Sequence, residues 1–162
     1  MITVKSIVYK PKSESGGHNV GYLRRPLQEA NLVEGYGIEG DRKGGNPNRN
    51  LNVMDAITID ELAGQGYPTG PGVLGENIIL SGVDLRTLPE GTQLRLGDEA
   101  VIALGKPRIP CEQLTPLDAR MPENVAGRVG VMCRVVQSGL VNVGDAVEVI
   151  AVVVQSQANL AD

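Results

Sequence analysis

The stretch GTQLRLGDEAVIALG, from Gly91 to Gly105, predicts a β-hairpin. Polar and apolar residues alternate in its first half, and a mostly apolar run follows Gly97 and Asp98. Alternation with period two is typical of a half-buried strand, and a Gly-Asp pair between two such runs indicates a tight turn. The segment VNVGDAVEV, from Val141 to Val149, has the same pattern. We interpret the likeness as two hairpins of a common kind rather than as an internal duplication.

Short strand patterns recur along the rest of the chain. They are ITVKSIVY at residues 2–9, LNVM at 51–54, NIILSG at 77–82, and two or three runs between 130 and 150. One short helix is indicated by TIDELAG, where Thr58 and Glu61 have the spacing of a capping box and Gly64 is a suitable end. The glycine-rich segment from Val33 to Asn50 is expected to consist mainly of turns.

The composition favours a mainly β fold. The 162 residues include 21 glycines and 10 prolines but no Phe or Trp, so the core must be built from aliphatic side chains. Many turns between Val- and Ile-rich runs suit a barrel, because closure removes exposed strand edges. We therefore predict one domain over residues 1–162, a closed or nearly closed β-barrel of about seven or eight strands with a few short helices.

Charge and hydropathy exclude several classes of function. The net charge of −4 and the absence of a basic run argue against nucleic-acid binding. The longest apolar stretch, VEVIAVVV at residues 147–154, contains Glu148 and is too short to cross a bilayer. The first residues lack the apolar region of a signal peptide. We expect a cytoplasmic protein without membrane contact, in which the two cysteines stay reduced.

The two cysteines differ in their surroundings. Cys133 alternates with Val131 and Val135, which predicts a small buried side chain. Cys111, in KPRIPCEQL at residues 106–114, belongs to no such pattern. The prolines beside it restrict the loop, and the fixed charge of Arg108 favours a thiolate if the guanidinium lies close. From spacing alone, a functional thiol and a structural loop cysteine both remain open.

Other polar residues also allow two interpretations. In GIEGDRKGG at residues 37–45, the backbone amides can form an anion nest assisted by Arg42, Lys43 and Arg49, or the loop is simply solvated. Glu76, in LGENI, suits either acid–base chemistry or the capping of backbone amides. With a single histidine, His18, and no paired cysteines, the sequence argues against a zinc site.

Several motifs in fixed order give the chain a more specific resemblance. They are GIEGDR (37–42), RNLNVMD (49–55), PGVLGENIILSGVDL (71–85), GTQLRLGD (91–98), PRIPCEQL (107–114) and GRVGVMCRVV (127–136) followed by VGD (143–145). This order resembles the MOSC domain family, the domains similar to the C-terminal part of molybdenum cofactor sulfurases. The resemblance covers roughly Val33 to Ile150 and implies a β-rich barrel.

The resemblance also implies a role for Cys111. In this family the cysteine is understood either to ligate the molybdenum of a pterin cofactor or to carry sulfur as a persulfide. The resemblance implies Asp41 and Glu76 as further catalytic residues. It also implies cofactor binding by Arg42, Arg49, Asn77 and Arg108, and the charge pattern of the glycine-rich loop adds Lys43 to this set.

The resemblance implies the first two of three candidate functions, and the residues alone allow the third. The first is a molybdenum-dependent enzyme that reduces N-hydroxylated compounds with electrons from a separate transfer protein. The second is a sulfur carrier loaded by a cysteine desulfurase, with pyridoxal phosphate on that partner or bound directly. The third is a non-catalytic module that binds an anionic small molecule. Lys43 stands where many family members have histidine. Larger members also carry an N-terminal β-barrel domain that helps to hold the cofactor, whereas only about thirty residues precede the motif region here. This difference favours the sulfur carrier.

Overall fold

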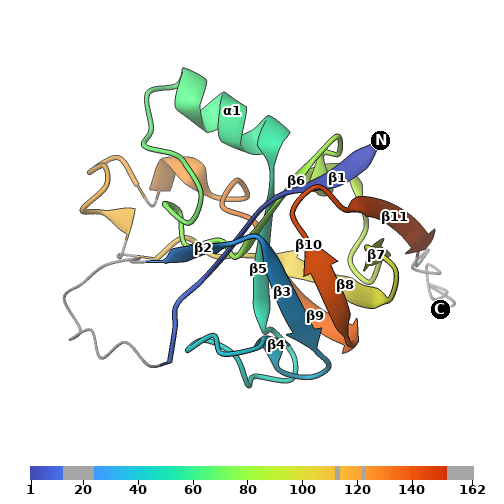
Figure 1. Ribbon diagram of the computed structural model, residues 1–162. Coiled ribbons are helices and arrows are strands. Elements are labelled where there is room, and N and C mark those ends of the chain that lie inside the picture. Colours follow the sequence, from blue (N-terminus) through green and yellow to red (C-terminus); the bar gives the residue numbers. More distant parts are fainter. Residues whose placement is uncertain (13–23, 112–113, 122, 153–162) are drawn as a thin grey trace, which may run out of the picture.

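The computed structural model describes residues 1–12, 24–111, 114–121 and 123–152 (Figure 1). His18 lies outside these residues. Within them there are one α-helix, α1 (Ala56–Gly64), and the single 3₁₀ turns η1 (Leu85–Thr87) and η3 (Glu123–Val125). The strands are β1 (Ile2–Tyr9), β2 (Arg25–Leu27), β3 (Glu29–Val33), β4 (Gly37–Ile38), β5 (Leu51–Asp55), β6 (Ile78–Ser81), β7 (Gln93–Leu96), β8 (Ala100–Pro107), β9 (Val131–Gln137), β10 (Gly139–Asn142) and β11 (Ala146–Ala151).

Seven of the described strands close into a barrel. Their order is β11-β7-β8-β9-β5-β6-β1, and pairing between β11 and β1 completes the ring. β2 extends the sheet beside β1, while β10, β3 and β4 form a separate three-stranded sheet. All barrel pairs are antiparallel except β5 and β6, which run parallel. The predicted mainly β barrel is therefore confirmed.

The two Gly-Asp segments have different structures. β7 and β8 form the predicted hairpin, with Leu96 opposite Ala100 and Gly97 in the turn at a φ of +67°. The second segment is not a hairpin, because β10 pairs with β3 whereas β11 pairs with β7 and β1. Gly144, at a φ of +94°, instead lies where the chain passes from the small sheet to the barrel. The prediction of a second hairpin was wrong because β10 finds its partner far away in the sequence.

Two apolar cores lie on opposite faces of the barrel wall. Aliphatic side chains fill the barrel itself, and β5 contributes Leu51 and Val53 to them. The alternate β5 residue Met54 belongs to the second core, with Leu62 of α1. Strand geometry explains the division, since successive side chains point to opposite faces. The remaining members of the second core are Tyr67, Leu74, Leu114, Met121, Val125 and Val129.

The N-cap of helix α1 lies three residues before the predicted one, Thr58. It is Asp55, the last residue of β5, whose Oδ1 accepts a hydrogen bond from the Thr58 amide at 2.7 Å. The Asp55 Oδ2 accepts from the Thr58 hydroxyl and from the Leu85 amide, each at 3.1 Å. A capping box opened by Thr58 was therefore wrong, while the predicted end at Gly64 is confirmed. Asp55 joins α1 to η1 and so fixes one end of a pocket described below.

Strand β8 carries an irregularity just before the predicted cysteine loop. Its register with β9 shifts between Leu104 and Pro107, and a Cβ on Gly105 would lie 2.4 Å from the Met132 carbonyl oxygen. Only glycine permits this close approach, because a real Cβ does not come so near a backbone oxygen.

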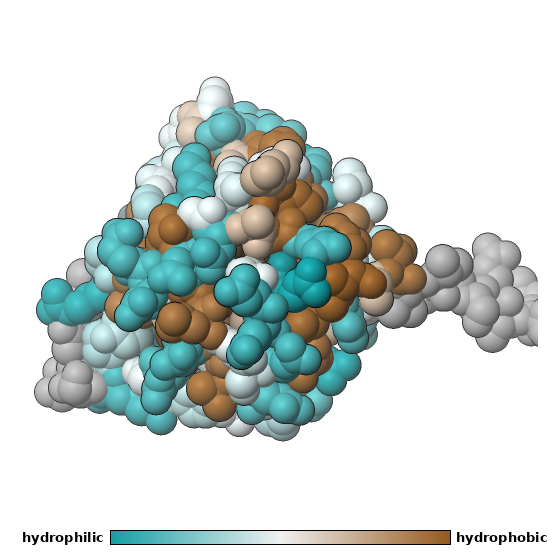
Figure 2. Space-filling view, turned by 45° about the vertical axis from the view of Figure 1, so that its right-hand side comes forward, coloured by the Kyte–Doolittle hydropathy of each residue, from teal (hydrophilic) through white to brown (hydrophobic). Residues whose placement is uncertain are grey.

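The surface mixes hydrophilic and hydrophobic residues, with the hydrophobic ones more frequent on the right-hand side of the view in Figure 2. On the C-terminal strand and the residue after it, Ile150 and Val152 are 40% and 53% exposed. Within the described residues, no helix has the length and apolar character needed to cross a membrane.

Candidate functional site

The loop that carries Cys111 is held at several points. It follows the end of β8, where the Arg108 amide donates to the Gly130 carbonyl at 2.9 Å. The Arg108 guanidinium donates to the Leu74 carbonyl, and the Cys111 carbonyl accepts from the Leu114 amide at 3.0 Å. The Cys111 side chain is nevertheless exposed. The loop thus presents a thiol to solvent from an anchored backbone.

Cys111 lines a cleft of about 610 Å³, which we call the cysteine cleft. The cleft brings four predicted site residues together, because Lys43, Arg49 and Arg108 line it as well. Two chain segments about sixty residues apart therefore meet at one surface. The remaining lining residues are Asn48, Glu90, Gly105, Lys106, Pro107, Ile109 and Met132.

Four cationic side chains and one carboxylate line the cysteine cleft. The side chains of Arg49 and Lys106 form no hydrogen bond or ion pair with any described residue. Burial is the main cause that lowers the pKa of Lys43, and neighbouring cations, Arg24 foremost and then Arg108, lower it further. A bound anion would relieve this repulsion. The electrostatics of the cleft therefore favour an anionic ligand, although the whole chain is acidic.

A small recess of about 90 Å³ adjoins the cleft and shares Lys43, Arg49 and Arg108 with it. Asn52 lines this recess and is only 6% exposed, yet its side-chain Nδ2 and Oδ1 have no hydrogen-bond partner among the described residues. A buried amide without partners is costly unless a ligand or water satisfies it. The recess therefore has a donor and an acceptor ready for the polar edge of a ligand.

Asn77 lines the same recess but is fully engaged. Its Nδ2 donates to the Val8 carbonyl at 3.3 Å and to the Asp41 Oδ2 at 3.2 Å. Its Oδ1 accepts from the Asn52 amide at 3.0 Å. Asn77 thus connects β1, β5 and the Asp41 loop beneath the recess.

The two predicted catalytic carboxylates are buried and lie outside the lining of the cleft. Asp41 is fully buried, and its Oδ1 accepts from the Lys10 amide at 3.0 Å. Glu76 is 1% exposed and accepts from the Gly72 amide at 2.6 Å and the Leu74 amide at 3.2 Å. Burial raises the pKa of Glu76. These contacts favour a supporting role: Glu76 fixes Leu74, whose carbonyl holds Arg108. Proton transfer by either carboxylate stays a prediction.

The anion nest suggested for the glycine-rich loop is not formed by four of its amides. The amides of Asp41, Arg42, Gly44 and Gly45 donate to the carbonyls of Ile38, Lys10, Asp41 and Tyr36, at 2.8 to 3.1 Å. They are not available to a ligand. Arg42 is exposed and does not line the cleft or the recess. The positive charge of the site comes from side chains.

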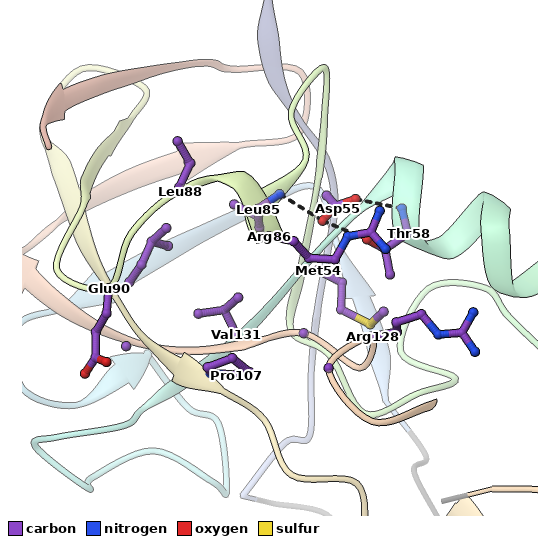
Figure 3. A pocket seen from close by; sticks show the side chains of 14 residues that line it. Met54, Asp55, Thr58, Leu85, Arg86, Leu88, Glu90, Pro107, Arg128 and Val131 are labelled. Carbon is purple, nitrogen blue, oxygen red and sulfur yellow. Dashed lines mark hydrogen bonds between the residues drawn. The ribbon is translucent and has the colours of Figure 1, made fainter. Parts of the chain in front are cut away.

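A second pocket of about 380 Å³, which we call the apolar pocket, lies beside the cysteine cleft (Figure 3). Three residues line both, namely Glu90, Gly105 and Pro107. The other lining residues are Met54, Asp55, Thr58, Leu85, Arg86, Leu88, Leu104, Gly127, Arg128, Gly130 and Val131.

Sequence reasoning missed several residues of the site. Lys106 lies in the segment KPRIPCEQL, two residues before Arg108, and this pair of cations could have indicated a positively charged site. Glu90, in a Leu-Pro-Glu-Gly turn, and Asn52, inside a strand, carry no motif of their own. Arg24 joins the recess from a segment without any recognised pattern.

The two thiols are expected to differ strongly in alkylation. Cys133 is fully buried, and burial raises its pKa to about 12, whereas Cys111 is exposed. At pH 8, iodoacetamide should modify Cys111 in the native protein and reach Cys133 only after unfolding. Peptide mass spectrometry with and without urea measures this. Equal labelling of both cysteines in the native protein would contradict the burial difference.

Together, the fold and the site define a β-barrel protein with a solvent-facing thiol in a cationic cleft. The model of the MOSC domain family matches residues 40–148, which include all eight predicted site residues. The chain therefore belongs to the MOSC domain family. Comparison with curated proteins gave no match.

Solved structures agree with this fold. YiiM from Geobacillus stearothermophilus superposes with a TM-score of 0.72 at 21% identity, covering 93% of this chain and 76% of that one. The YuaD protein from Bacillus subtilis gives 0.70 at 22% identity, with coverages of 91% and 94%. YiiM from Escherichia coli gives 0.67 at 25% identity, with coverages of 93% and 71%.

Proposed function

We propose that this protein associates with a molybdenum–pterin cofactor and reduces N-hydroxylated compounds, with the Cys111 thiolate as the protein ligand to the metal. One observation carries the proposal: an exposed thiol lines the same cleft as four cationic side chains. Thiolate is a soft ligand that suits such a metal, and the cations suit the negatively charged part of a pterin cofactor.

The residues fit a group that brings most of its own ligands. No cluster of three or more His, Cys, Asp or Glu side chains able to hold a metal ion occurs among the described residues. A bare ion would therefore find too few protein ligands there. A metal that is already held by its cofactor needs only one ligand from the protein. Arg49, Lys106 and Arg108 would hold its anionic part, and Asn52 would satisfy its buried amide on the polar ring edge.

The chemistry divides between cofactor, chain and partner. Reduction of R–NHOH to R–NH₂ and water consumes two protons and two electrons and breaks the N–O bond. When bound, the cofactor supplies the two-electron redox chemistry, and a separate electron-transfer protein supplies the electrons. The chain's own residues bind the cofactor and orient the substrate. Among the described carboxylates, Glu90 is the one that lines the cleft.

The proposal predicts that metal content depends on Cys111. Protein purified from a host that makes the cofactor should contain close to one molybdenum per chain, measured by inductively coupled plasma mass spectrometry. The Cys111→Ala variant should fall to background, because the soft ligand is lost. Cys133→Ala is the matched control, since that thiol is buried away from the cleft. Wild-type protein without molybdenum, or equal content in Cys111→Ala, would refute metal ligation.

A sulfur carrier is the second candidate, and the shape of the loop favours it. Ile109 is 85% exposed two residues before the exposed Cys111, so a partner protein can reach the thiol. A desulfurase with pyridoxal phosphate would transfer sulfur from its own cysteine persulfide to the Cys111 thiolate, recovering its own thiolate. Intact-mass measurement after incubation with cysteine and the desulfurase should show a gain of one sulfur, about 32 Da, absent in Cys111→Ser. If the protein binds anions but carries neither molybdenum nor a persulfide, the result would support the third function, a non-catalytic anion-binding module.

A further inference from the structure

We propose that the apolar pocket is the substrate site and takes an apolar nitrogen base, with its body among the aliphatic walls and its N–H-bearing head at Glu90. That this molecule then reacts beside Cys111 rests on the proposed function. Its binding does not, because the pocket and Glu90 exist independently of any cofactor.

The walls of the pocket are mainly hydrocarbon. Met54, Leu85 and Leu88 contribute apolar side chains on one side, and Pro107 and Val131 face them across the space (Figure 3). A volume of about 380 Å³ is within the usual range for small-molecule sites. Burial of a ring or a branched alkyl group here would displace water from apolar surface, which is favourable.

Most polar groups of the pocket are already bonded to the protein. Both Asp55 carboxylate oxygens accept hydrogen bonds, two from Thr58 and one from Leu85. Arg86 donates to the carboxylates of Asp84 and Glu61 at 2.8 to 2.9 Å. These charges are compensated, so they offer a ligand little.

Arg128 is also engaged, and it lies at the far end. Its Nη1 donates to the Gln65 side chain at 2.7 Å and its Nη2 to the Asn124 carbonyl at 2.6 Å. In Figure 3 its guanidinium is directed away from Val131 and Pro107, and Glu90 lies at the opposite side of the pocket. A ligand's polar head would therefore meet Glu90 rather than Arg128 on the side toward Cys111.

Glu90 is the polar group left for recognition. Its side chain is exposed and makes no hydrogen bond or ion pair with any described residue. A carboxylate accepts hydrogen bonds and attracts cations, so it selects an amine or a similar N–H donor and repels a carboxylate. This charge complementarity defines the class of ligand.

The position of Glu90 also fixes which end of the ligand faces the thiol. Glu90, Gly105 and Pro107 line both the apolar pocket and the cysteine cleft. Gly105 has no side chain to separate the two spaces, and a Cβ there would lie 2.4 Å from the Met132 carbonyl oxygen. A nitrogen held at Glu90 is therefore at the entrance of the cleft that contains Cys111, while the apolar body stays behind it.

Three probes with one ring and different heads test the proposal: benzylamine, benzyl alcohol and benzoate. Binding is measured by ligand-observed NMR titration on Cys111→Ala protein. This variant lacks the proposed metal ligand, so the result does not depend on whether the wild type binds molybdenum. Benzylamine should bind more tightly than benzyl alcohol, and benzoate, which the cationic cleft can bind, should displace neither of them from the apolar pocket. Glu90→Gln should weaken benzylamine about fivefold and leave benzyl alcohol unchanged, as expected for one exposed charge-assisted contact. Glu90→Lys should reverse the preference toward benzoate.

Two variants locate the site. Val131→Phe adds bulk inside the pocket and should weaken benzylamine and benzyl alcohol alike, with folding checked by its thermal transition. Glu99→Gln removes another exposed carboxylate outside the pocket and should change nothing. Absence of benzylamine binding, displacement of bound benzylamine by benzoate, or no effect of Glu90→Gln would overturn the proposal. A failed molybdenum assay would leave this result standing.

Discussion

Replacing Gly130 by alanine should destabilise the protein by about 4 kcal/mol, from positive-φ strain and overpacking together. Gly130 has a φ of +101°, a conformation that residues with a Cβ rarely adopt. An added Cβ would lie 2.4 Å from the Asn52 Oδ1 and 2.9 Å from both the Met54 Cγ and the Val53 carbonyl oxygen. The Val53 oxygen belongs to the backbone of β5, inside the barrel wall, and cannot move aside cheaply.

Gly127 provides a matched control three residues earlier. It also has a positive φ, +77°, but nothing lies within 4 Å of the Cβ it would gain. Gly127→Ala should therefore cost only the conformational strain, about 1 to 2 kcal/mol. Urea unfolding followed by circular dichroism measures both variants. Losses that agree within about 1 kcal/mol would show that the contacts around Gly130 relax, contrary to our expectation.

Gly130 links this stability effect to the site. Its carbonyl accepts a hydrogen bond from the Arg108 amide, so a displaced Gly130 would also move the start of the Cys111 loop. Asn52, whose Oδ1 is the atom nearest to the added Cβ, lines the recess beside the cleft. The variant should therefore change the rate of Cys111 alkylation even where the protein remains folded, whereas Gly127→Ala should not.

Those parts of the fold that depend on local patterns could be predicted from the sequence. The β7–β8 hairpin needs only alternation and a turn between neighbouring runs, and it was found. The Gly144–Asp145 segment has the same local pattern, yet its strands pair with β3, β7 and β1. Which partner wins is decided by the closure of the barrel, a property of the whole chain. Asp55 was missed as the helix cap for a related reason. It is the last residue of a strand as well as the N-cap, and the local sequence does not distinguish the two positions.

The site divides in the same way. The thiol, Arg49 and Arg108 were predicted through the family motifs, and Lys43 through the charges of the glycine-rich loop, because a short motif fixes which side chains lie next to one another. Glu90 and Asn52 become noticeable only through their surroundings, one at the wall between two cavities and the other buried without a partner. Asp41 and Glu76 illustrate the opposite case. A carboxylate that holds backbone amides and one that faces a ligand look identical in sequence.

Removing Arg108 should weaken the positive potential at Cys111, and the thiol itself can report the change. Iodoacetate and iodoacetamide alkylate the same sulfur but differ in charge, so the ratio of their rates measures the local potential. Arg108 lines both the cleft and the recess, and its charge is felt at Lys43. Arg108→Ala should therefore lower the iodoacetate-to-iodoacetamide ratio about three- to tenfold, as expected for the loss of one charge that lines the same cleft as the thiol.

Two further variants separate charge from structure. Arg108→Lys keeps the charge but not the guanidinium that donates to the Leu74 carbonyl, so it should preserve most of the ratio while changing both rates together. Arg42→Ala removes an exposed arginine that does not line the cleft, and its ratio should equal that of the wild type. Salt should reduce the wild-type ratio, because screening weakens exposed charges. An Arg108→Ala ratio equal to that of Arg42→Ala would mean that the cations of the cleft do not act on the sulfur, and both anionic-cofactor binding and thiolate chemistry at Cys111 would lose their electrostatic basis.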